Sequence, residues 1–246
     1  MPVASDLTIK IFADGADLAG IKIMAEKPWV KGFTTNPTLM RKAGIVDYKP
    51  FALEVLAVEQ ERPISFEVFA DDFAEMEQQA LEIASWGKNV YVKIPVTNTR
   101  QEFAGPLIRR LTNAGVMLNV TAVFTLEQVR GITENLSADV PAIVSIFAGR
   151  IADTGLDPVP LMAESLQIIA SKPKTELLWA SPRELLNLVQ ADACGCHIIT
   201  MTNDMLSKLP LLGKDLGQYS LETVEMFYRD ASAAGYRIER AAAAAA

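Results

Sequence analysis

The chain has 246 residues, half of them hydrophobic, and 30 acidic against 23 basic residues give it a formal net charge of −7. Because nucleic-acid binding needs a basic face, this balance argues against a polyphosphate partner. The sequence has no apolar run of about 18 residues and no basic-then-apolar leader, and Cys194 and Cys196 form no disulfide framework. We therefore expect a soluble, intracellular, globular protein.

Short apolar runs alternate with longer amphipathic segments along the chain. The strand-like runs are 8–14, 31–35, 63–68, 89–95, 116–122, 141–147, 176–181 and 196–202. Each is mostly apolar without strict alternation, which is typical of strands covered on both faces. Helical patterns lie between them at 71–87, 101–114, 125–136, 158–171, 183–193 and 221–234.

Eight strands alternating with helices over about 235 residues predict an α/β fold, a (β/α)8 TIM barrel. A doubly wound open sheet is the alternative, but its first turn carries a phosphate-binding glycine fingerprint, which ADGADLAG (13–20) lacks. No Pro-, Gly- or Ser-rich linker interrupts the alternation. We predict one barrel with a C-terminal helix over residues 1–240, and we exclude the six alanines at 241–246 from functional reasoning.

Polar residues gather at the ends of the predicted strands, where a barrel of this type builds its active site. In chain order they are Asp14, Thr34, Thr35, Asn36, Glu67, Lys93, Asn119, Thr121, Ser145, Ser181, Thr200 and Thr202. Barrel interiors are otherwise filled by branched apolar side chains. So many polar residues at strand ends therefore indicate a functional site.

Lys93 gives the sharpest hypothesis about chemistry. It lies within VYVKIP (90–95), where Val92 and Ile94 predict a desolvated setting. Burial disfavours the charged ammonium, and a neutral amine adds to a ketone to form a Schiff base. The alternative is a lysine that extends to solvent from an edge strand, but a closed barrel has no edge.

Asp14 and Glu67 are the strand-end carboxylates within reach of a central lysine. Schiff-base chemistry needs proton transfer, and a carboxyl group in a mostly closed pocket suits a general acid or base. The alternative for Asp14 is an N-cap of the helix that follows it. The sequence leaves both interpretations of Asp14 open.

The segment 145–158 and Arg183 together predict an anion site. A loop is expected to leave the sixth strand at Arg150, and a helix is expected to begin near Pro158. Arg183 is expected to open the helix after the seventh strand. Two arginines beside a helix N-terminus suit a terminal phosphate. The alternative is a pair of surface arginines in ion pairs, with Arg150 bonded to Asp153.

Five segments resemble the successive signatures of the transaldolase family, in the family's order. They are GFTTNPTL (32–39), VYVKIPVT (90–97), LNVTAVF (118–124), VSIFAGRIADTGLDP (144–158) and LWASPRE (178–184). The resemblance covers nearly the whole chain to about residue 210, and the length is similar to that of the short, bacterial-type members. It implies a class I aldolase-like barrel that uses no cofactor and no metal.

The resemblance also implies a role for each strand-end residue. Lys93 would form the Schiff base with the donor ketose phosphate, and Asp14 would act in the proton transfer at the carbon–carbon bond. Glu67, with Thr121 and a water, would serve formation and hydrolysis of the imine. The residues implied in substrate binding are Thr34, Asn36, Asn119, Ser145, Phe147, Arg150, Ser181 and Arg183.

The implied reaction moves dihydroxyacetone from sedoheptulose 7-phosphate to glyceraldehyde 3-phosphate. Its products are erythrose 4-phosphate and fructose 6-phosphate, so the resemblance implies a cytoplasmic transferase of the pentose phosphate pathway. The segment 221–238 resembles the family's final helix, which short members use in ring-shaped oligomers. A homo-oligomer, with a decameric ring as one form, is therefore expected.

Fructose 6-phosphate aldolases belong to the same family and release free dihydroxyacetone. They typically have Gln in place of Glu67 and Tyr in place of Phe147. A tyrosine hydroxyl assists protonation of the enamine and so releases the donor, whereas phenylalanine cannot. Both residues therefore favour a transferase, and the aldolase is the alternative.

The chain departs from the family pattern at three positions. Ile146 replaces a common proline, Pro182 replaces an aromatic residue, and Glu184 replaces a neutral one. Pro182 fits the first turn of a helix. Glu184 adds a negative charge beside the expected phosphate site, which leaves a related anionic sugar as a further alternative.

Two other classes of protein compete with this interpretation. A non-catalytic sugar-phosphate binder would keep the arginines but would not need Lys93, Asp14 and Glu67 together. A metal-dependent enzyme would need more ligands than the sequence offers, because His197 is expected in the core and Cys194 and Cys196 lack further Cys or His partners.

Overall fold

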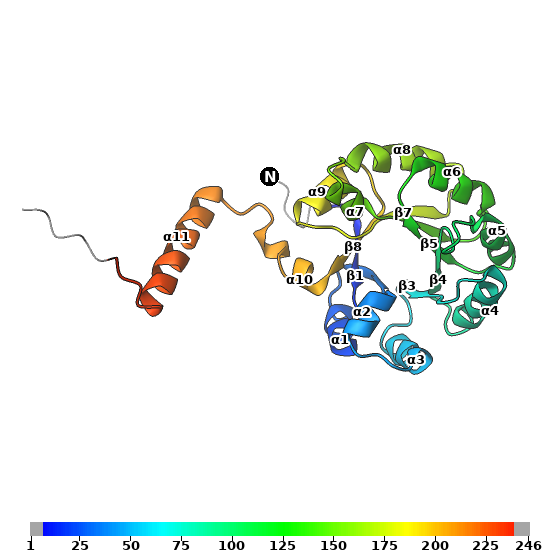
Figure 1. Cartoon of the computed structure of the whole chain (residues 1–246), viewed down its shortest axis with the longest axis horizontal. Coiled ribbons are helices and arrows are strands. Elements are labelled where there is room, and N and C mark those ends of the chain that lie inside the picture. The colour runs from blue at the N-terminus through cyan, green and yellow to red at the C-terminus, as the bar shows by residue number, and fades with distance from the viewer. Residues whose placement is uncertain (1–6, 239–246) are drawn as a thin grey trace, which may run out of the picture.

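The computed structural model describes residues 7–238, in which eight parallel strands close into a barrel in chain order (Figure 1). The strands are β1 (Lys10–Asp14), β2 (Val30–Thr34), β3 (Ile64–Glu67), β4 (Val90–Pro95), β5 (Leu118–Val123), β6 (Ala142–Ile146), β7 (Thr175–Trp179) and β8 (Ile198–Thr202). β8 pairs with β1 and completes the circle. The predicted (β/α)8 fold is confirmed, and each strand lies within the run of residues that predicted it or extends one residue beyond it.

Helices form the outer layer of the barrel, with the exception of α11, which lies away from it. They are α1 (Leu18–Ala25), α2 (Pro37–Lys42), α3 (Tyr48–Val58), α4 (Phe73–Ala84), α5 (Gly105–Asn113), α6 (Leu126–Asn135), α7 (Ala148–Asp153), α8 (Val159–Ile169), α9 (Leu186–Ala193), α10 (Asn203–Leu206) and α11 (Leu216–Ala233), with a 3-10 turn η2 (Leu209–Leu211). Side-chain caps begin several of them. Asp17, Asp72 and Thr125 accept hydrogen bonds from backbone N–H groups of the first turns of α1, α4 and α6.

Two predictions about helix boundaries are wrong. The segment after β6 is not a loop, because α7 follows β6 directly and α8 then begins beside Pro158 as expected. Arg183 does not open a helix, since α9 begins at Leu186 and Pro182 lies in the turn before it. The cause is local: Asn187 Oδ1 accepts hydrogen bonds from the N–H groups of Arg183 and Glu184, which stabilises a turn ahead of the helix.

The barrel interior has an apolar layer below a polar one. Phe12, Ile143, Leu178 and Ile198 are buried together and fill the middle of the barrel. A Cβ atom at Gly32 would lie 2.5 Å from the Phe12 ring, so glycine in β2 makes room for that ring. This apolar layer closes the barrel beneath the polar strand-end residues, so these residues are accessible from one end of the barrel only.

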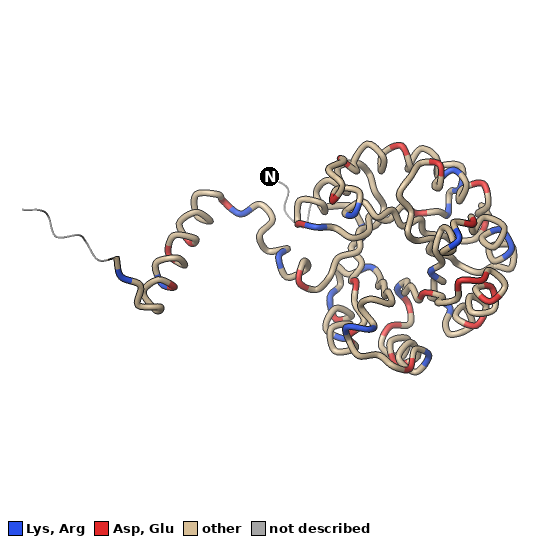
Figure 2. Tube along the Cα trace, in the orientation of Figure 1, with Lys and Arg blue, Asp and Glu red and all other residues tan. Residues whose placement is uncertain are grey.

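Basic and acidic residues are interspersed around the outer helices (Figure 2). Their ion pairs join neighbouring helices, for example Arg110 to Glu77 and Arg130 to Glu164. These pairs are exposed and individually contribute little to stability. The charged residues of the ring therefore mark a solvated surface.

Helix α11 lies apart from the barrel, beyond α10 and η2 (Figure 1). None of its residues is buried, and its first turn is capped by Asp215. It begins five residues before the predicted helix at 221–234. Within residues 7–238 no helix combines the length and the apolar character that crossing a membrane requires. The six alanines at 241–246 lie outside the described residues.

Candidate functional site

A cavity of about 450 Å³ opens at the C-terminal ends of the strands. It contains every residue for which the sequence predicted a role. These are Asp14, Thr34, Asn36, Glu67, Lys93, Asn119, Thr121, Ser145, Phe147, Arg150, Ser181 and Arg183. The structure thus brings together side chains from the six strands β1 to β6 and from the segments that follow β2, β6 and β7.

Lys93 lines this cavity and is 7% exposed. Its Nζ donates a hydrogen bond to the Thr35 carbonyl at 3.1 Å and lies 3.3 Å from Glu67 Oε2. Glu67 and Lys93 are directly paired residues of β3 and β4, so both side chains point into the barrel. The amine therefore has one carboxylate beside it that can accept a proton.

Asp14 points into the cavity from the end of β1. Its Oδ1 accepts a hydrogen bond from Thr34 Oγ1 at 2.7 Å, and Thr34 Oγ1 lies 2.5 Å from Thr200 Oγ1. Burial raises the pKa of Asp14, and the positive charge of Lys93 and the Thr34 bond offset this only in part. The N-cap interpretation is wrong, because the residue that caps α1 is Asp17.

A chain of buried polar side chains crosses β3, β5 and β6. Ser145 Oγ donates to Asn119 Oδ1 at 2.6 Å, and Asn119 Nδ2 donates to Ser65 Oγ at 2.9 Å. All three residues are buried. This network fixes the amide of Asn119 from both sides, and so fixes which of its atoms faces the cavity.

The first turn of α2 fixes the side chain of Asn36. Its Oδ1 accepts the Leu39 N–H at 3.0 Å, which caps the helix that Pro37 begins. This bond uses one lone pair of the amide oxygen, and the NH₂ group of Asn36 can donate to a ligand. The cap thus fixes the orientation of the Asn36 amide at the cavity wall.

A distortion of β5 positions Thr121. Ala122 has a φ of +58°, and the pairing of β5 with β6 shifts register between Val120 and Val123. Such bulges re-aim side chains near active sites. Thr121 Oγ1 is buried without a hydrogen-bond partner among the described residues, which leaves it available to a water or a ligand.

The arginines lie at the outer end of the cavity. The Arg183 Nε donates to Asp153 Oδ1 at 2.9 Å and its Nη2 to Oδ2 at 2.5 Å, and both side chains are about half exposed. The Arg150 guanidinium lies over the Phe147 ring, 5.1 Å from its centre. The alternative in which Arg150 pairs with Asp153 is therefore wrong, since Asp153 forms its ion pair with Arg183.

Glu184 does not line the cavity, and its side chain is exposed. Its backbone is held by Asn187, which turns the chain ahead of α9. The negative charge that the sequence places next to Arg183 is therefore directed to solvent. His197, expected in the core, is exposed instead, and its Nδ1 accepts the Leu177 N–H at 3.0 Å.

Sequence reasoning missed Ser65 and assigned no role to Thr200. Ser65 precedes Glu67 by two residues in β3, so strand alternation places both on the inner face. That signal was available in the sequence. Thr200 was among the strand-end residues, and its contact with Thr34 across the β1–β8 closure required the structure.

Comparisons with known proteins agree with this geometry. The profile of the transaldolase/fructose-6-phosphate aldolase family matches residues 11–245. A protein named "probable transaldolase" from Dehalococcoides mccartyi is 37% identical over 202 residues, which cover 82% of this chain and 90% of that one. Another of that name, from Rhodospirillum centenum, is 34% identical over 219 residues, 86% of this chain and 89% of that one.

A solved structure of 2,3-dimethylmalate lyase, a member of the PEP mutase/isocitrate lyase superfamily, aligns with a TM-score of 0.56. The alignment covers 92% of this chain and 85% of that one at 12% identity. At such low identity the likeness concerns the barrel fold alone.

Proposed function

Because this chain belongs to the transaldolase/fructose-6-phosphate aldolase family, we propose that it is a transaldolase that moves a dihydroxyacetone unit between sugar phosphates through a Schiff base on Lys93. The observation that carries the proposal is the buried Lys93 amine with Glu67 Oε2 at 3.3 Å, in a cavity that Asp14 also lines. The donor and acceptor are sedoheptulose 7-phosphate and glyceraldehyde 3-phosphate. The reaction belongs to the pentose phosphate pathway and takes place in the cytoplasm, where such sugar phosphates are held.

The first step needs a neutral amine. Glu67 accepts a proton from the Lys93 ammonium, and the free amine attacks the C2 carbonyl of the ketose. A proton returns to the oxygen of the carbinolamine, which leaves as water and gives the imine. Thr121 Oγ1, buried and unpartnered among the described residues, holds this water.

The second step breaks a carbon–carbon bond. The Asp14 carboxylate takes the proton of the C4 hydroxyl, the C3–C4 bond breaks, and its electron pair moves into the enamine while the aldehyde leaves. The raised pKa of Asp14 suits it to hold this proton. When the acceptor aldehyde enters, the enamine attacks its carbonyl carbon and Asp14 returns the proton to the new hydroxyl.

The fate of the enamine distinguishes the two activities of the family. Phe147 lies at the cavity between the Phe124 ring, 5.7 Å away, and the Arg150 guanidinium. A phenyl ring offers no proton to the enamine carbon, so the intermediate waits for an aldehyde. This supports the transferase over the aldolase.

Arg150 and Arg183 bind the phosphate of the sugar, with Ser181 beside them. Ser181 has a φ of +57°, a strained conformation that is common at ligand sites. Arg183 is already paired with Asp153, whereas Arg150 forms no ion pair with any of residues 7–238. Arg150 therefore makes the larger contribution to phosphate binding.

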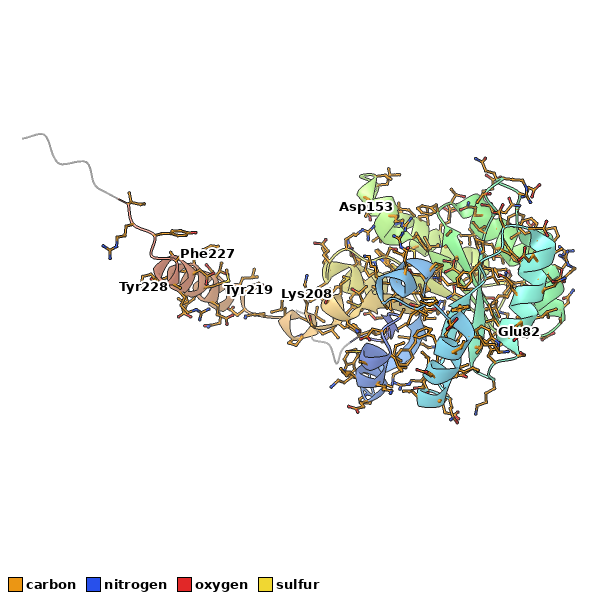
Figure 3. All side chains as sticks on the ribbon, turned by 60° about the horizontal axis from the view of Figure 1, so that its bottom comes forward. Glu82, Asp153, Lys208, Tyr219, Phe227 and Tyr228 are labelled. Carbon is orange, nitrogen blue, oxygen red and sulfur yellow. The ribbon has the colours of Figure 1, made fainter. Side chains whose placement is uncertain are left out.

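We also propose that the protein is a homo-oligomer, with a decameric ring as one form. Support comes from α11, where the side chains of Tyr219, Phe227 and Tyr228 are exposed (Figure 3). Val224 of the same helix is also exposed. A helix whose apolar side chains are left uncovered by the rest of residues 7–238 is typical of an interface. A second copy of the chain is the occupant consistent with the family resemblance.

The test is borohydride reduction in the presence of fructose 6-phosphate, followed by peptide mapping. A reduced dihydroxyacetone adduct on Lys93, absent from Lys93→Met and retained in Lys42→Met, supports the mechanism. Lys42 is a suitable control because it is exposed and does not line this cavity. An active enzyme without an adduct, or an adduct on another lysine, contradicts the proposal.

The same preparation separates the two family activities. Fructose 6-phosphate consumption is followed with and without erythrose 4-phosphate. Turnover that requires the acceptor identifies a transferase. Release of free dihydroxyacetone at the same rate without acceptor identifies the aldolase.

A further inference from the structure

The backbone of Glu67, at the end of β3, has no paired residue in β2 on that side of the strand. β2 pairs with β3 only through Phe33 opposite Ile64 and Thr34 opposite Ser65. The last main-chain bond between them runs from the Thr35 N–H to the Ser65 carbonyl at 3.2 Å. In a parallel strand the N–H and C=O of one residue point to the same neighbour, so those of Glu67 face the space that β2 has left.

One side-chain hydroxyl fills that space. The Tyr48 OH accepts the Glu67 N–H at 2.7 Å and donates to the Glu67 carbonyl at 3.0 Å. A phenolic hydroxyl is both a donor and an acceptor, so a single atom replaces the two groups that a strand would supply. Tyr48 is the first residue of α3, and the barrel thus continues for one more residue on its β2 side through a side chain.

The Tyr48 ring is held by three other aromatic rings. Phe69 lies at 4.6 Å, Trp86 at 5.5 Å and Phe66 at 6.2 Å between ring centres. Trp86 is itself fixed by a hydrogen bond from its Nε1 to Glu82 Oε1 at 3.0 Å. Burial raises the pKa of Tyr48, so the hydroxyl keeps the proton that it donates.

We propose that Tyr48 is a positioning residue for the proton-transfer carboxylate of this site: its hydroxyl fixes the backbone of Glu67 at the end of β3 and thereby holds Glu67 Oε2 beside Lys93 Nζ. This inference rests on the proposed function. Tyr48 does not line the cavity. Its effect on catalysis passes through Glu67 alone.

The test is a double-mutant cycle of Tyr48→Phe with Glu67→Gln. Tyr48→Phe keeps the ring packing and removes both hydrogen bonds. A misplacement of about 1 Å costs on the order of 100-fold in rate, so we expect kcat to fall by about 10- to 100-fold with little change in KM. Where Glu67 is already Gln, Tyr48→Phe should change kcat by less than about 3-fold, because the two residues act as one unit.

Tyr91→Phe is the matched control. Tyr91 is also half-buried and projects into the barrel, but it is packed in the apolar layer below the site and does not line the cavity. The kcat of Tyr91→Phe should stay near the wild-type value. An equal fold-loss from Tyr48→Phe in the wild-type and Glu67→Gln backgrounds overturns the proposal, as does an unchanged kcat in Tyr48→Phe.

A second measurement is independent of turnover. Hydrogen exchange at the Glu67 amide should become at least about 10-fold faster in Tyr48→Phe and remain unchanged in Tyr91→Phe. An unchanged exchange rate in Tyr48→Phe overturns the positioning role. If wild type forms no Schiff base with any ketose phosphate, the proposed function fails, and the exchange result still decides whether Tyr48 holds this backbone.

Discussion

At the scale of single residues, the site buries charged groups whose neighbours offset only part of the free-energy cost of desolvation. Asp14 is the clearest case, because burial raises its pKa although Lys93 and Thr34 both favour the carboxylate. A buried carboxyl of this kind lowers stability at neutral pH while serving proton transfer. Stability and activity are therefore expected to respond in opposite directions when its charge is removed.

Asp14→Asn should unfold at a higher temperature than wild type at pH 7 and should lose activity. The sign follows from linkage: the raised folded-state pKa costs stability as pH rises from the ordinary Asp value of 3.8 through the folded-state pKa. The gain in Tm, about 2–4 °C per kcal/mol for a chain of this size, should vanish near pH 3.5. Thermal unfolding at both pH values measures this.

Asp153→Asn is the control, because it is expected to change the Tm at pH 7 in the opposite direction. Arg183 holds the pKa of Asp153 below its usual range, so this substitution should lower the Tm slightly at pH 7. A lower Tm for Asp14→Asn at pH 7 would contradict the argument.

Arg150→Ala should raise KM for fructose 6-phosphate by about 10- to 100-fold, because charge-assisted hydrogen bonds contribute about 1.5–3 kcal/mol. We expect kcat at saturation to change little, since Arg150 lies away from the reacting carbons. Steady-state kinetics measure both constants. The control is Arg130→Ala, which breaks an exposed ion pair with Glu164 on the outer helices. Equal effects of the two substitutions would exclude Arg150 from phosphate binding.

At the scale of elements, close contacts between loops fix the phosphate end of the cavity. Gly149, in the first turn of α7, donates its N–H to the Ala180 carbonyl at 3.2 Å. A Cβ on Gly149 would lie 1.5 Å from the Ser181 carbonyl oxygen, which is backbone and cannot move aside alone. α7 therefore packs on the turn after β7 only because this residue is glycine.

Gly149→Ala is expected to push α7 from that turn. Overpacking costs about 1–3 kcal/mol, so the Tm should fall by several degrees, and KM for the phosphorylated donor should rise about 10-fold. Differential scanning calorimetry and steady-state kinetics measure the two effects. Gly217→Ala in exposed α11 is the control, and it should leave KM unchanged and should not lower the Tm, because Ala favours a helix over Gly. A Gly149→Ala protein with wild-type KM would show that α7 does not set this end of the cavity.

At the scale of the whole molecule, an acidic barrel carries a helix that it does not cover. No residue of α11 is buried, and the apolar side chains of Val224 and Phe227 are 60% and 63% exposed. Burial of such side chains is favourable by about 25 cal/mol per Å². Association of several copies would supply that burial.

Phe227→Asp should dissociate the assembly, because the new carboxylate would be buried at the interface without a partner of opposite charge. Light scattering coupled to gel filtration should then give the mass of one chain. Gln218→Glu adds the same charge to the first turn of α11, where a helix tolerates it, and should keep the assembly intact. Dissociation in both variants, or in neither, would contradict an interface built on the apolar residues of α11.

Much of the fold and of the candidate site can be predicted from the pattern of residues along the chain. Parallel strands covered on both faces are apolar runs, and their C-terminal ends meet on one face, so the sequence alone predicts that Lys93, Asp14 and Glu67 converge. The twelve predicted residues do line one cavity. Their chemical roles remain predictions, because convergence is geometry and not reaction.

Other features depend on contacts that no local pattern contains. Asp153 bonds Arg183, 30 residues away, and not the nearby Arg150. Tyr48 bonds the backbone of Glu67, 19 residues on, because β2 ends early and α3 is packed across the gap. Strand alternation and composition act over a few residues, whereas partner choice depends on how helices and loops pack around the barrel, and that is decided in three dimensions.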